Sequence, residues 1–200
     1  MSSELPIMEA FYTIQGEGAF SGQAAYFVRV GGCDVGCVWC DVKESWDAGE
    51  HPTRTVQDIV EDAGKHQARM AVITGGEPLM YDMAPLTRAL AEAGFRVHLE
   101  TSGAYPITGD WHWVCLSPKK FKAPVEGVHE KADELKVIVA NKHDLQWAQE
   151  HAEQVNDSCR CFLQPEWSKA ERMMPLIIDF VKENPRWEVS LQTHKFMNIP

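Results

Sequence analysis

Short apolar runs alternate with longer amphipathic stretches along most of the chain. The runs are rich in β-branched residues, which favour strands. They predict strands at residues 24–30, 68–74, 95–101, 112–117, 134–140, 161–165 and 187–193. Apolar residues at helical spacing predict helices at residues 55–66, 83–94, 142–152 and 168–184. Gly94 is expected to cap the second helix, and Pro175 is expected to kink or split the fourth.

The alternation of strand and helix predicts an α/β fold with a mainly parallel sheet and right-handed crossovers. A complete eight-unit barrel uses roughly 250 residues, whereas this chain has 200. We therefore expect an open, partial (β/α) barrel with a shortened helix complement. No internal repeat, low-complexity segment or linker divides the sequence, so residues 1–200 are predicted to form a single domain.

Composition narrows the class of protein. Apolar residues make up 44% of the chain, with seven Trp and eight Phe, which is enough for a substantial core. The formal charge of −10 argues against a nucleic-acid partner, because phosphate backbones require a basic surface. The sequence has neither a signal-like start nor eighteen consecutive apolar residues, so we expect a cytoplasmic protein with no membrane association.

Small and polar residues follow several of the predicted strands. In parallel α/β folds, ligands collect at the carboxyl ends of the strands. The first strand leads into "GGCDVGCVWC", and later strands lead into "TGGEP" (74–78), "ETSG" (100–103), "SPK" (117–119) and "QPEW" (164–167). Any one of these segments could be a turn with a helix cap. Five of them together predict a binding cleft at this end of the sheet.

Three cysteines, Cys33, Cys37 and Cys40, form a CxxxCxxC pattern. Thiols stay reduced in the cytoplasm, where clustered cysteines more often bind metal than form disulfides. A structural zinc site needs a fourth ligand, for which Cys159 or Cys161 would have to be recruited. Three thiolates on an iron–sulfur cluster instead leave one iron open for chemistry, which we favour. Cys115, Cys159 and Cys161 lie in strand-like segments and are predicted to be buried core residues.

The cysteine spacing resembles that of the radical S-adenosylmethionine (SAM) enzymes, and "TGGEP" is similar to the glycine-rich strand exit of these enzymes. The resemblance implies the open barrel of the radical SAM type. It also implies a 4Fe-4S cluster on Cys33, Cys37 and Cys40 that binds SAM at its open iron and releases a 5'-deoxyadenosyl radical. Gly75 and Gly76 would allow close backbone approach, and Glu77 would meet the methionyl ammonium.

Both ends of the chain resemble a narrower family, the 7-carboxy-7-deazaguanine synthases. The similarity lies in "FYTIQGEG" (11–18), in Arg29 and in "LQTHKFMNIP" (191–200), and it extends over essentially the whole chain. It implies conversion of 6-carboxy-5,6,7,8-tetrahydropterin into 7-carboxy-7-deazaguanine with loss of ammonia, a lyase step of queuosine and deazapurine biosynthesis. It further implies a flavodoxin- or ferredoxin-type electron donor and a homodimer.

The resemblance also implies two sets of site residues. SAM is expected at Gly75, Gly76, Glu77, Glu100, Ser102, Ser117, Pro118, Lys119, Gln164, Pro165, Glu166 and Trp167. The pterin is expected at Ile14, Gln15, Gly16, Glu17, Arg29, Thr74, His194 and Pro200.

Chemical complementarity supports the pterin set. The 2-amino-pyrimidinone edge of a pterin is rich in N–H donors and suits the acceptors of Gln15, Gly16 and Glu17, while the pterin carboxylate suits the fork of Arg29. A surface salt bridge is the alternative role for Arg29. The segment from Lys195 to Pro200 is too short for another helix, and we expect it to fold over the pterin and to offer its terminal carboxylate.

One position departs from the family. Many members have Thr two residues after the third cysteine and use it to hold Mg²⁺, whereas this chain has Val42. Valine has no oxygen ligand for magnesium. Asp41 or a water could replace it, Lys43 could take the place of the metal, or the metal could be dispensable.

Three other functions are compatible with parts of the sequence. A radical activase of a partner protein shares the cysteine motif, although it has no use for Arg29 and "IQGEG" around a pterin. A non-catalytic zinc module and a pure interaction protein are the other two, and the colour of anaerobically prepared protein would separate them from a cluster enzyme.

Overall fold

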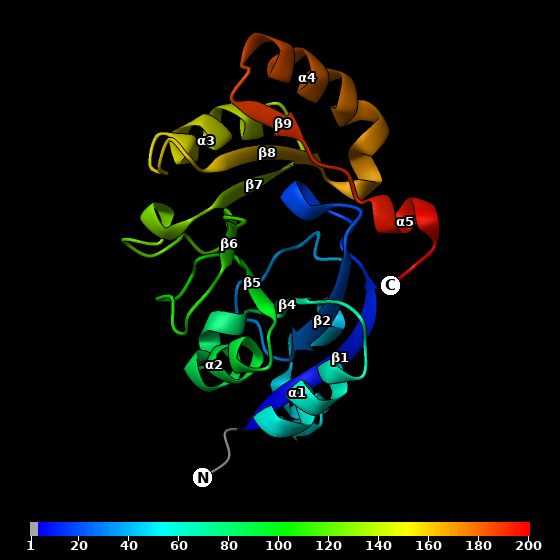
Figure 1. The fold of residues 1–200 in the computed structure, drawn as a ribbon. Helices are drawn as coiled ribbons and strands as arrows, with labels where there is room; N and C mark the ends of the chain where they lie inside the picture. The colour runs from blue at the N-terminus through cyan, green and yellow to red at the C-terminus, as the bar shows by residue number, and fades with distance from the viewer. Residues whose placement is uncertain (1–3) are drawn as a thin grey trace.

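The computed structural model describes residues 4–200 and contains one nine-stranded sheet (Figure 1). Its strand order is β3-β1-β2-β4-β5-β6-β7-β8-β9. All neighbours from β2 to β9 are parallel, and β1 is antiparallel to β2 and β3. The expected open, mainly parallel partial barrel is therefore confirmed. The strands are β1 (Glu4–Ile14), β2 (Ala24–Val30), β3 (Thr53–Thr55), β4 (Met70–Gly75), β5 (Arg96–Thr101), β6 (Trp113–Leu116), β7 (Glu134–Val139), β8 (Arg160–Pro165) and β9 (Trp187–Val189).

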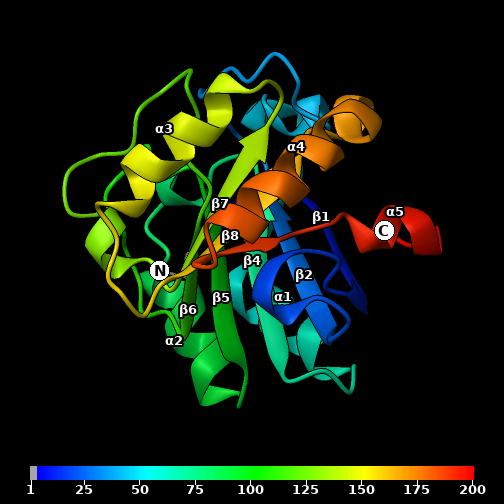
Figure 2. The same cartoon turned by 90° about the horizontal axis from the view of Figure 1, so that it is seen from above.

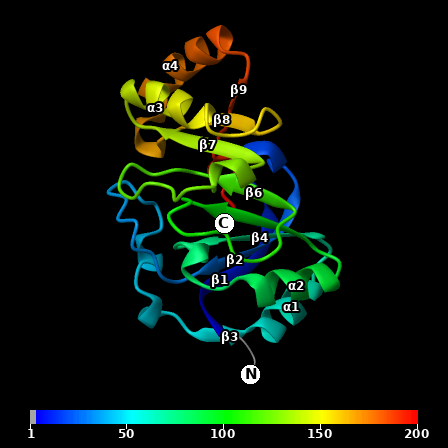
Figure 3. The same ribbon diagram turned by 90° about the vertical axis from the view of Figure 1, so that its left-hand side faces the viewer.

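Helices cover the outer face of the sheet, with α1 beside β1 and β3, α2 beside β5, α3 beside β7 and α4 beside β8 (Figure 3). The four predicted helices are present, and a fifth short helix follows β9. Between β5 and β6 the described chain forms a loop without a helix. The helices are α1 (Val56–Gly64), α2 (Ala84–Glu92), α3 (His143–Ala152), α4 (Ala170–Glu183) and α5 (Thr193–Met197). No helix within residues 4–200 is long and apolar enough to cross a bilayer.

The expected split of the fourth helix at Pro175 is wrong. Pro175 lies inside α4, and the helix runs through it without interruption. Its side chain is exposed, so the missing hydrogen bond falls on the solvent side of the helix. Met173 and Ile177 on the opposite side are buried against the sheet and hold the helix in place.

The two faces of the sheet differ in character. On β7, Leu135, Val137 and Val139 pack outward into an apolar core that includes Ile177 of α4. A second apolar core packs β2 and β4 against α1 and α2. On the concave side, β7 presents Glu134 and Lys136, both of which are almost fully buried. Because side chains alternate along a strand, the apolar residues fix the outer face and direct the charged ones into the barrel.

A loop after β1 enters the open side of the barrel. It contains the short 3-10 helix η1 (Gly18–Phe20), drawn in blue beside β7 in Figure 1. The Ala19 amide donates to Glu134 Oε2 over 3.1 Å, and the Gly18 amide donates to Ser190 Oγ over 3.0 Å. Gly18 has a φ of 61°, and a Cβ there would come within 2.8 Å of the Glu134 carboxyl carbon. Glycine is therefore required where the loop crosses β7.

The two ends of the chain contain the largest departures from the sequence-based prediction. Strands β1 and β3 were not predicted, and the strand expected at 187–193 ends at Val189. The expectation that the last residues are too short for another helix is also wrong, because α5 begins at Thr193. Figure 2 shows α5 beside the end of β1. The Thr13 hydroxyl of β1 donates a hydrogen bond of 3.4 Å to the carbonyl of Pro200, which follows α5.

Candidate active site

A cavity of about 280 Å³ opens at the carboxyl ends of the parallel strands. It brings together residues from β1 at one end of the chain and from α5 at the other. Twenty-three of the predicted site residues line it: Ile14, Gln15, Gly16, Glu17, Arg29, Cys33, Cys37, Cys40, Asp41, Thr74, Gly75, Gly76, Glu77, Glu100, Ser102, Ser117, Lys119, Gln164, Pro165, Glu166, Trp167, His194 and Pro200. Pro118 is the exception, since it is buried without lining the cavity.

Backbone contacts fix the loop that carries the three cysteines. The Glu77 amide donates to the Gly32 carbonyl over 2.8 Å, and the Cys33 amide donates to the Trp46 carbonyl over 3.1 Å. A Cβ on Gly76 would lie 2.6 Å from the Gly32 carbonyl carbon. The cysteine loop therefore rests directly on the exit of β4, and a side chain at Gly76 would push the two apart.

The three thiols share one wall of the cavity. Cys37 is buried beside Val35 and Ala104, and Cys33 and Cys40 pack against this group. Burial raises the pKa of Cys33, and it raises that of Cys37 to about 11 despite the nearby Lys119. Cys37 therefore needs a bound cation if it is to be a thiolate at neutral pH.

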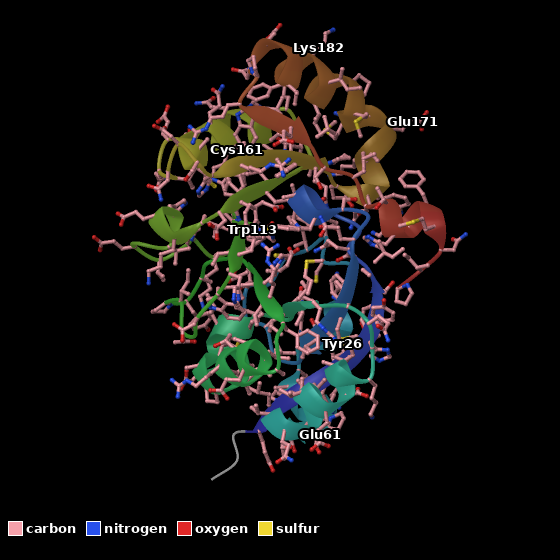
Figure 4. All side chains as sticks on the ribbon, viewed as in Figure 1. Tyr26, Glu61, Trp113, Cys161, Glu171 and Lys182 are labelled. Carbon is pink, nitrogen blue, oxygen red and sulfur yellow. The ribbon has the colours of Figure 1, made fainter. Side chains whose placement is uncertain are left out.

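These thiols fit an iron–sulfur cluster better than a zinc ion. Within residues 4–200, no three His, Cys, Asp or Glu side chains converge as ligands of one metal ion must. Thiolates of a four-iron cluster bind separate irons and need not converge on one point. The remote thiols that a zinc site would need, Cys159 and Cys161, lie in the apolar core, with Cys161 between the sheet and α3 (Figure 4). Cys115 is also buried, as predicted.

Glu77 joins the exits of β4 and β5. Its carboxylate is 1% exposed and accepts hydrogen bonds from Thr101 Oγ1 at 2.6 Å and from the Ser102 amide at 2.9 Å. The Leu79 amide and the Ser102 hydroxyl also donate to it. Much of its acceptor capacity therefore holds the "ETSG" exit in position. Its contact with a methionyl ammonium stays a prediction.

Polar groups from the exits of β6 and β8 also line the cavity. Lys119 Nζ donates to the Ser117 carbonyl and hydroxyl at 2.7 and 2.6 Å. The side-chain oxygen of Gln164 accepts from Ser190 Oγ at 2.7 Å. Trp167 stands at the rim with 44% of its surface exposed. Each of these groups is held by its own local contacts.

Arg29 forms a salt bridge and also lines the cavity, and its contact with the substrate stays a prediction. Its Nε donates to Glu9 Oε1 over 2.6 Å, which is a salt bridge at the rim. Its side chain also lines the cavity and is only 20% exposed. Within residues 4–200, the ion pair uses Nε alone, so the two terminal nitrogens remain available for a bound carboxylate.

The α5 segment lines the cavity and is joined to the loop after β1. The Gly16 carbonyl accepts from both the amide and the hydroxyl of Thr193, at 2.9 and 3.0 Å. Gln192 Nε2 donates to Glu17 Oε1 over 2.9 Å, which ties α5 to the loop after β1. A Cβ on Gly16 would come within 2.8 Å of His194, so the two segments approach at van der Waals limits.

The surroundings of Asp41 do not fit a magnesium ion. Lys195 Nζ lies 3.3 Å from Asp41 Oδ2, and Gln192 Nε2 donates to the same oxygen over 3.4 Å. The neighbouring Val42 offers no oxygen ligand. A metal ion here would have to displace the ammonium of Lys195, so we assign no step to magnesium. Lys43, the other candidate cation, does not line the cavity.

Sequence reasoning missed four polar residues that line the cavity, Ser45, Thr101, Lys136 and Gln192. Lys136 Nζ lies 2.6 Å from Glu17 Oε2 and 2.7 Å from Glu100 Oε2. Burial alone would raise the pKa of Glu17, but Lys136 outweighs it and holds that pKa at about 2. The parity of β7 could have identified Lys136, because it shares a face with Glu134 and not with Leu135 and Val137.

Comparison with known proteins identifies relatives of this chain in sequence and in fold. The model of the Radical SAM superfamily matches residues 27–157. The chain is 60% identical to the 7-carboxy-7-deazaguanine synthase of Flavobacterium psychrophilum over 196 residues, which cover 98% of this chain and 93% of the relative. The protein of that name from Synechocystis sp. is 45% identical over 97% of this chain and 93% of its own. The crystal structure of QueE from Escherichia coli matches with a TM-score of 0.85 and 31% identity, over 94% of this chain and 93% of that one.

Proposed function

Because the chain belongs to the radical SAM superfamily and, within it, to the 7-carboxy-7-deazaguanine synthase family, we propose that it converts 6-carboxy-5,6,7,8-tetrahydropterin into 7-carboxy-7-deazaguanine with loss of ammonia. This reaction serves queuosine and deazapurine biosynthesis. One observation carries the proposal. A single cavity is lined by the three thiols, Arg29, the loop after β1 and the α5 segment.

The cofactor half of the cavity would hold the cluster on Cys33, Cys37 and Cys40, and SAM along the exits of β4, β5, β6 and β8. When bound, these groups supply a 5'-deoxyadenosyl radical that removes a hydrogen atom from the substrate. The carboxylates of Glu77 and Glu100 suit the positive charges of SAM, and Ser102 suits a ribose hydroxyl. Gly75 and Gly76 keep this wall free of side chains.

The pterin half would orient the substrate. Glu17 stays ionised at neutral pH and can accept hydrogen bonds from the pterin edge, as can the side-chain oxygen of Gln15. The terminal nitrogens of Arg29 would take the substrate carboxylate in a paired geometry. His194 and Pro200 on the α5 side would cover the bound ring and exclude water.

The same proposal covers the setting of the enzyme. We place it in the cytoplasm as a homodimer, with a flavodoxin- or ferredoxin-type protein as its electron donor.

The test is anaerobic turnover. Reconstituted protein with SAM and a reductant should be brown and should convert 6-carboxytetrahydropterin into the deazaguanine, detected by mass. Cys37→Ser should lose iron and all formation of 5'-deoxyadenosine, while Cys161→Ala should keep both, because Cys161 lies in the core.

Two results would contradict the proposal. One is iron-loaded protein that cleaves SAM without transforming the pterin, as expected of an activase. The other is Cys37→Ser protein with normal iron and turnover.

A further inference from the structure

One lysine that lines the cavity is almost fully buried inside the barrel. Lys136 is 3% exposed, and its neighbours Leu135 and Val137 point the other way into the apolar core. A buried ammonium is costly unless charged partners and hydrogen bonds satisfy it. Glu17 and Glu100 satisfy Lys136, at 2.6 and 2.7 Å. The chain therefore maintains this cation through two specific contacts.

The two carboxylates belong to different halves of the cavity. Glu17 lies on the loop after β1 and receives Gln192 from the α5 side. Glu100 lies at the end of β5 and receives Gln15 Nε2 over 3.3 Å. Lys136 thus contacts both the pterin-side loop and the cofactor-side strand exit, and Gln15 forms a second, uncharged link between them.

Without the ammonium, the two carboxylates would face each other in a low-dielectric interior. Like charges at that range repel strongly, and one of the carboxylates would take up a proton or turn away. A third carboxylate, Glu134, lies on β7 with Lys136 and accepts hydrogen bonds from the Ala19 amide and the Trp113 indole. No other lysine or arginine in residues 4–200 forms an ion pair with Glu17 or Glu100.

We propose that Lys136 is a positioning residue that couples the two halves of the site, because one ammonium fixes the orientation and charge of both Glu17 and Glu100. This inference rests on the proposed function. Lys136 touches neither reacting atoms nor substrate in this role, and it acts through the two carboxylates. Binding of SAM against Glu100 and binding of the pterin against Glu17 therefore share one geometric constraint.

The charged groups around the pair set the expected pH behaviour. Glu17 faces Lys136 from β7 and His194 from α5, and Lys136 faces Cys115, Glu100 and Glu134. In the wild-type protein, Glu17 remains ionised across the physiological range. Without Lys136, burial would raise the pKa of Glu17, so falling pH would protonate it and remove an acceptor from the pterin site.

The first experiment compares Lys136→Met and Lys136→Arg in the reconstituted holoenzyme, with Lys182→Met on the exposed face of α4 as control. In Lys136→Met, the KM for the pterin should rise by at least about tenfold and should rise further as the pH falls from 8 to 6. Lys136→Arg keeps the charge and should keep the flat pH profile. A Lys136→Met enzyme with the pH profile and KM of the control would overturn the inference.

Cross-effects between the ligands provide the second measurement, which does not need Lys136→Met to fold. Glu100→Gln should raise the KM for the pterin as well as the Kd for SAM, and Glu17→Gln should raise the Kd for SAM as well as the KM for the pterin. Effects confined to the nearer ligand would overturn the coupling. Failure of the proposed function is separable, because wild-type protein would then fail to convert the pterin at all.

Discussion

Replacing Gly16 by alanine tests how α5 is held over the cavity. The new Cβ would lie 2.8 Å from His194 Cβ and Cγ, and nearer still to the ring nitrogen Nδ1. Ordinary carbon contacts lie at about 3.5–4.0 Å, so one of the two segments must move by about 1 Å. His194 Cβ belongs to the rigid base of its side chain, so the ring cannot relieve the clash by rotating alone.

The two hydrogen bonds between Gly16 and Thr193 set the free-energy cost of this movement. The Gly16 carbonyl accepts from the Thr193 amide and hydroxyl at 2.9 and 3.0 Å, and both bonds would stretch beyond their useful range. Each bond contributes about 0.5–1.5 kcal/mol, so the closed position of α5 would lose about 1–3 kcal/mol. If the pterin binds only beneath closed α5, kcat/KM for the pterin should fall about 5- to 150-fold.

The assay is anaerobic turnover at low pterin concentration, with iron content and pterin-independent formation of 5'-deoxyadenosine measured alongside. Both of these should remain normal in Gly16→Ala, because the three nearest atoms to the added Cβ all belong to His194 and none to the cysteine loop. Gly64→Ala at the end of α1 is the matched control, since no atom lies within 4 Å of its added Cβ. Thr193→Val removes one of the two bonds without adding bulk near Gly16 and should show a smaller loss. Gly16→Ala protein with unchanged kcat/KM for the pterin would refute the reasoning.

Three further predictions concern the rim, the metal and stability. Arg29→Lys should raise the KM for the pterin by about tenfold with little change in the Kd for SAM, because one ammonium cannot serve Glu9 and a carboxylate in paired geometry; equal losses for both ligands would count against this role. A chelator should change the wild-type rate little, whereas Val42→Thr combined with Lys195→Gln should make the rate respond to Mg²⁺; a wild-type enzyme that is inactive without Mg²⁺ would show that another oxygen ligates it. Burial lowers the pKa of His98 from 6.5 to about 4. Between these values, the unfolded chain binds a proton that the folded chain does not. His98 therefore makes the free energy of unfolding fall by about 1.4 kcal/mol for each pH unit that the pH drops. In urea titrations at pH 7 and pH 5, His98→Phe should show a smaller drop in midpoint than wild type, and an equal drop would contradict the assignment.

The parallel part of the fold was predictable because its signals are local. Runs such as Ala24–Val30 and Glu134–Val139 carry β-branched residues between turn signals, and the amphipathic segments between them predict the helices that cover the sheet. Strand β1 was missed because Pro6 and several polar residues interrupt its apolar pattern. Helix α5 has five residues, too few for intrinsic helix propensity to decide. Contacts such as those between Thr193 and Gly16 hold it, and they are invisible in the local sequence.

Among the site residues too, those with local sequence signals were predictable and those that depend on long-range contacts were not. The residues at the strand exits could be located because parallel strands end at one edge of the sheet. Lys136 was missed because a lysine in an apolar strand is usually exposed, and the carboxylates that pair with it come from distant parts of the sequence, the loop after β1 and the end of β5. The ion pair between Arg29 and Glu9 follows from the antiparallel register of β1 and β2, and β1 itself was not predicted.

The loop after β1 and the α5 segment meet across most of the length of the chain. Their hydrogen bonds join residues 172 to 177 positions apart, and most of these contacts are polar. Forming such contacts costs a large loop-closure entropy, and little apolar burial offsets that cost. The seam between these segments should therefore open at a much lower free energy than the sheet. In native-state hydrogen exchange, the amides of Gly18 and Thr193 should exchange well before those of β4 and β7. The pterin half of the cavity would then open locally while the sheet stays folded. The rigid pterin ring could enter through this opening without unfolding of the barrel.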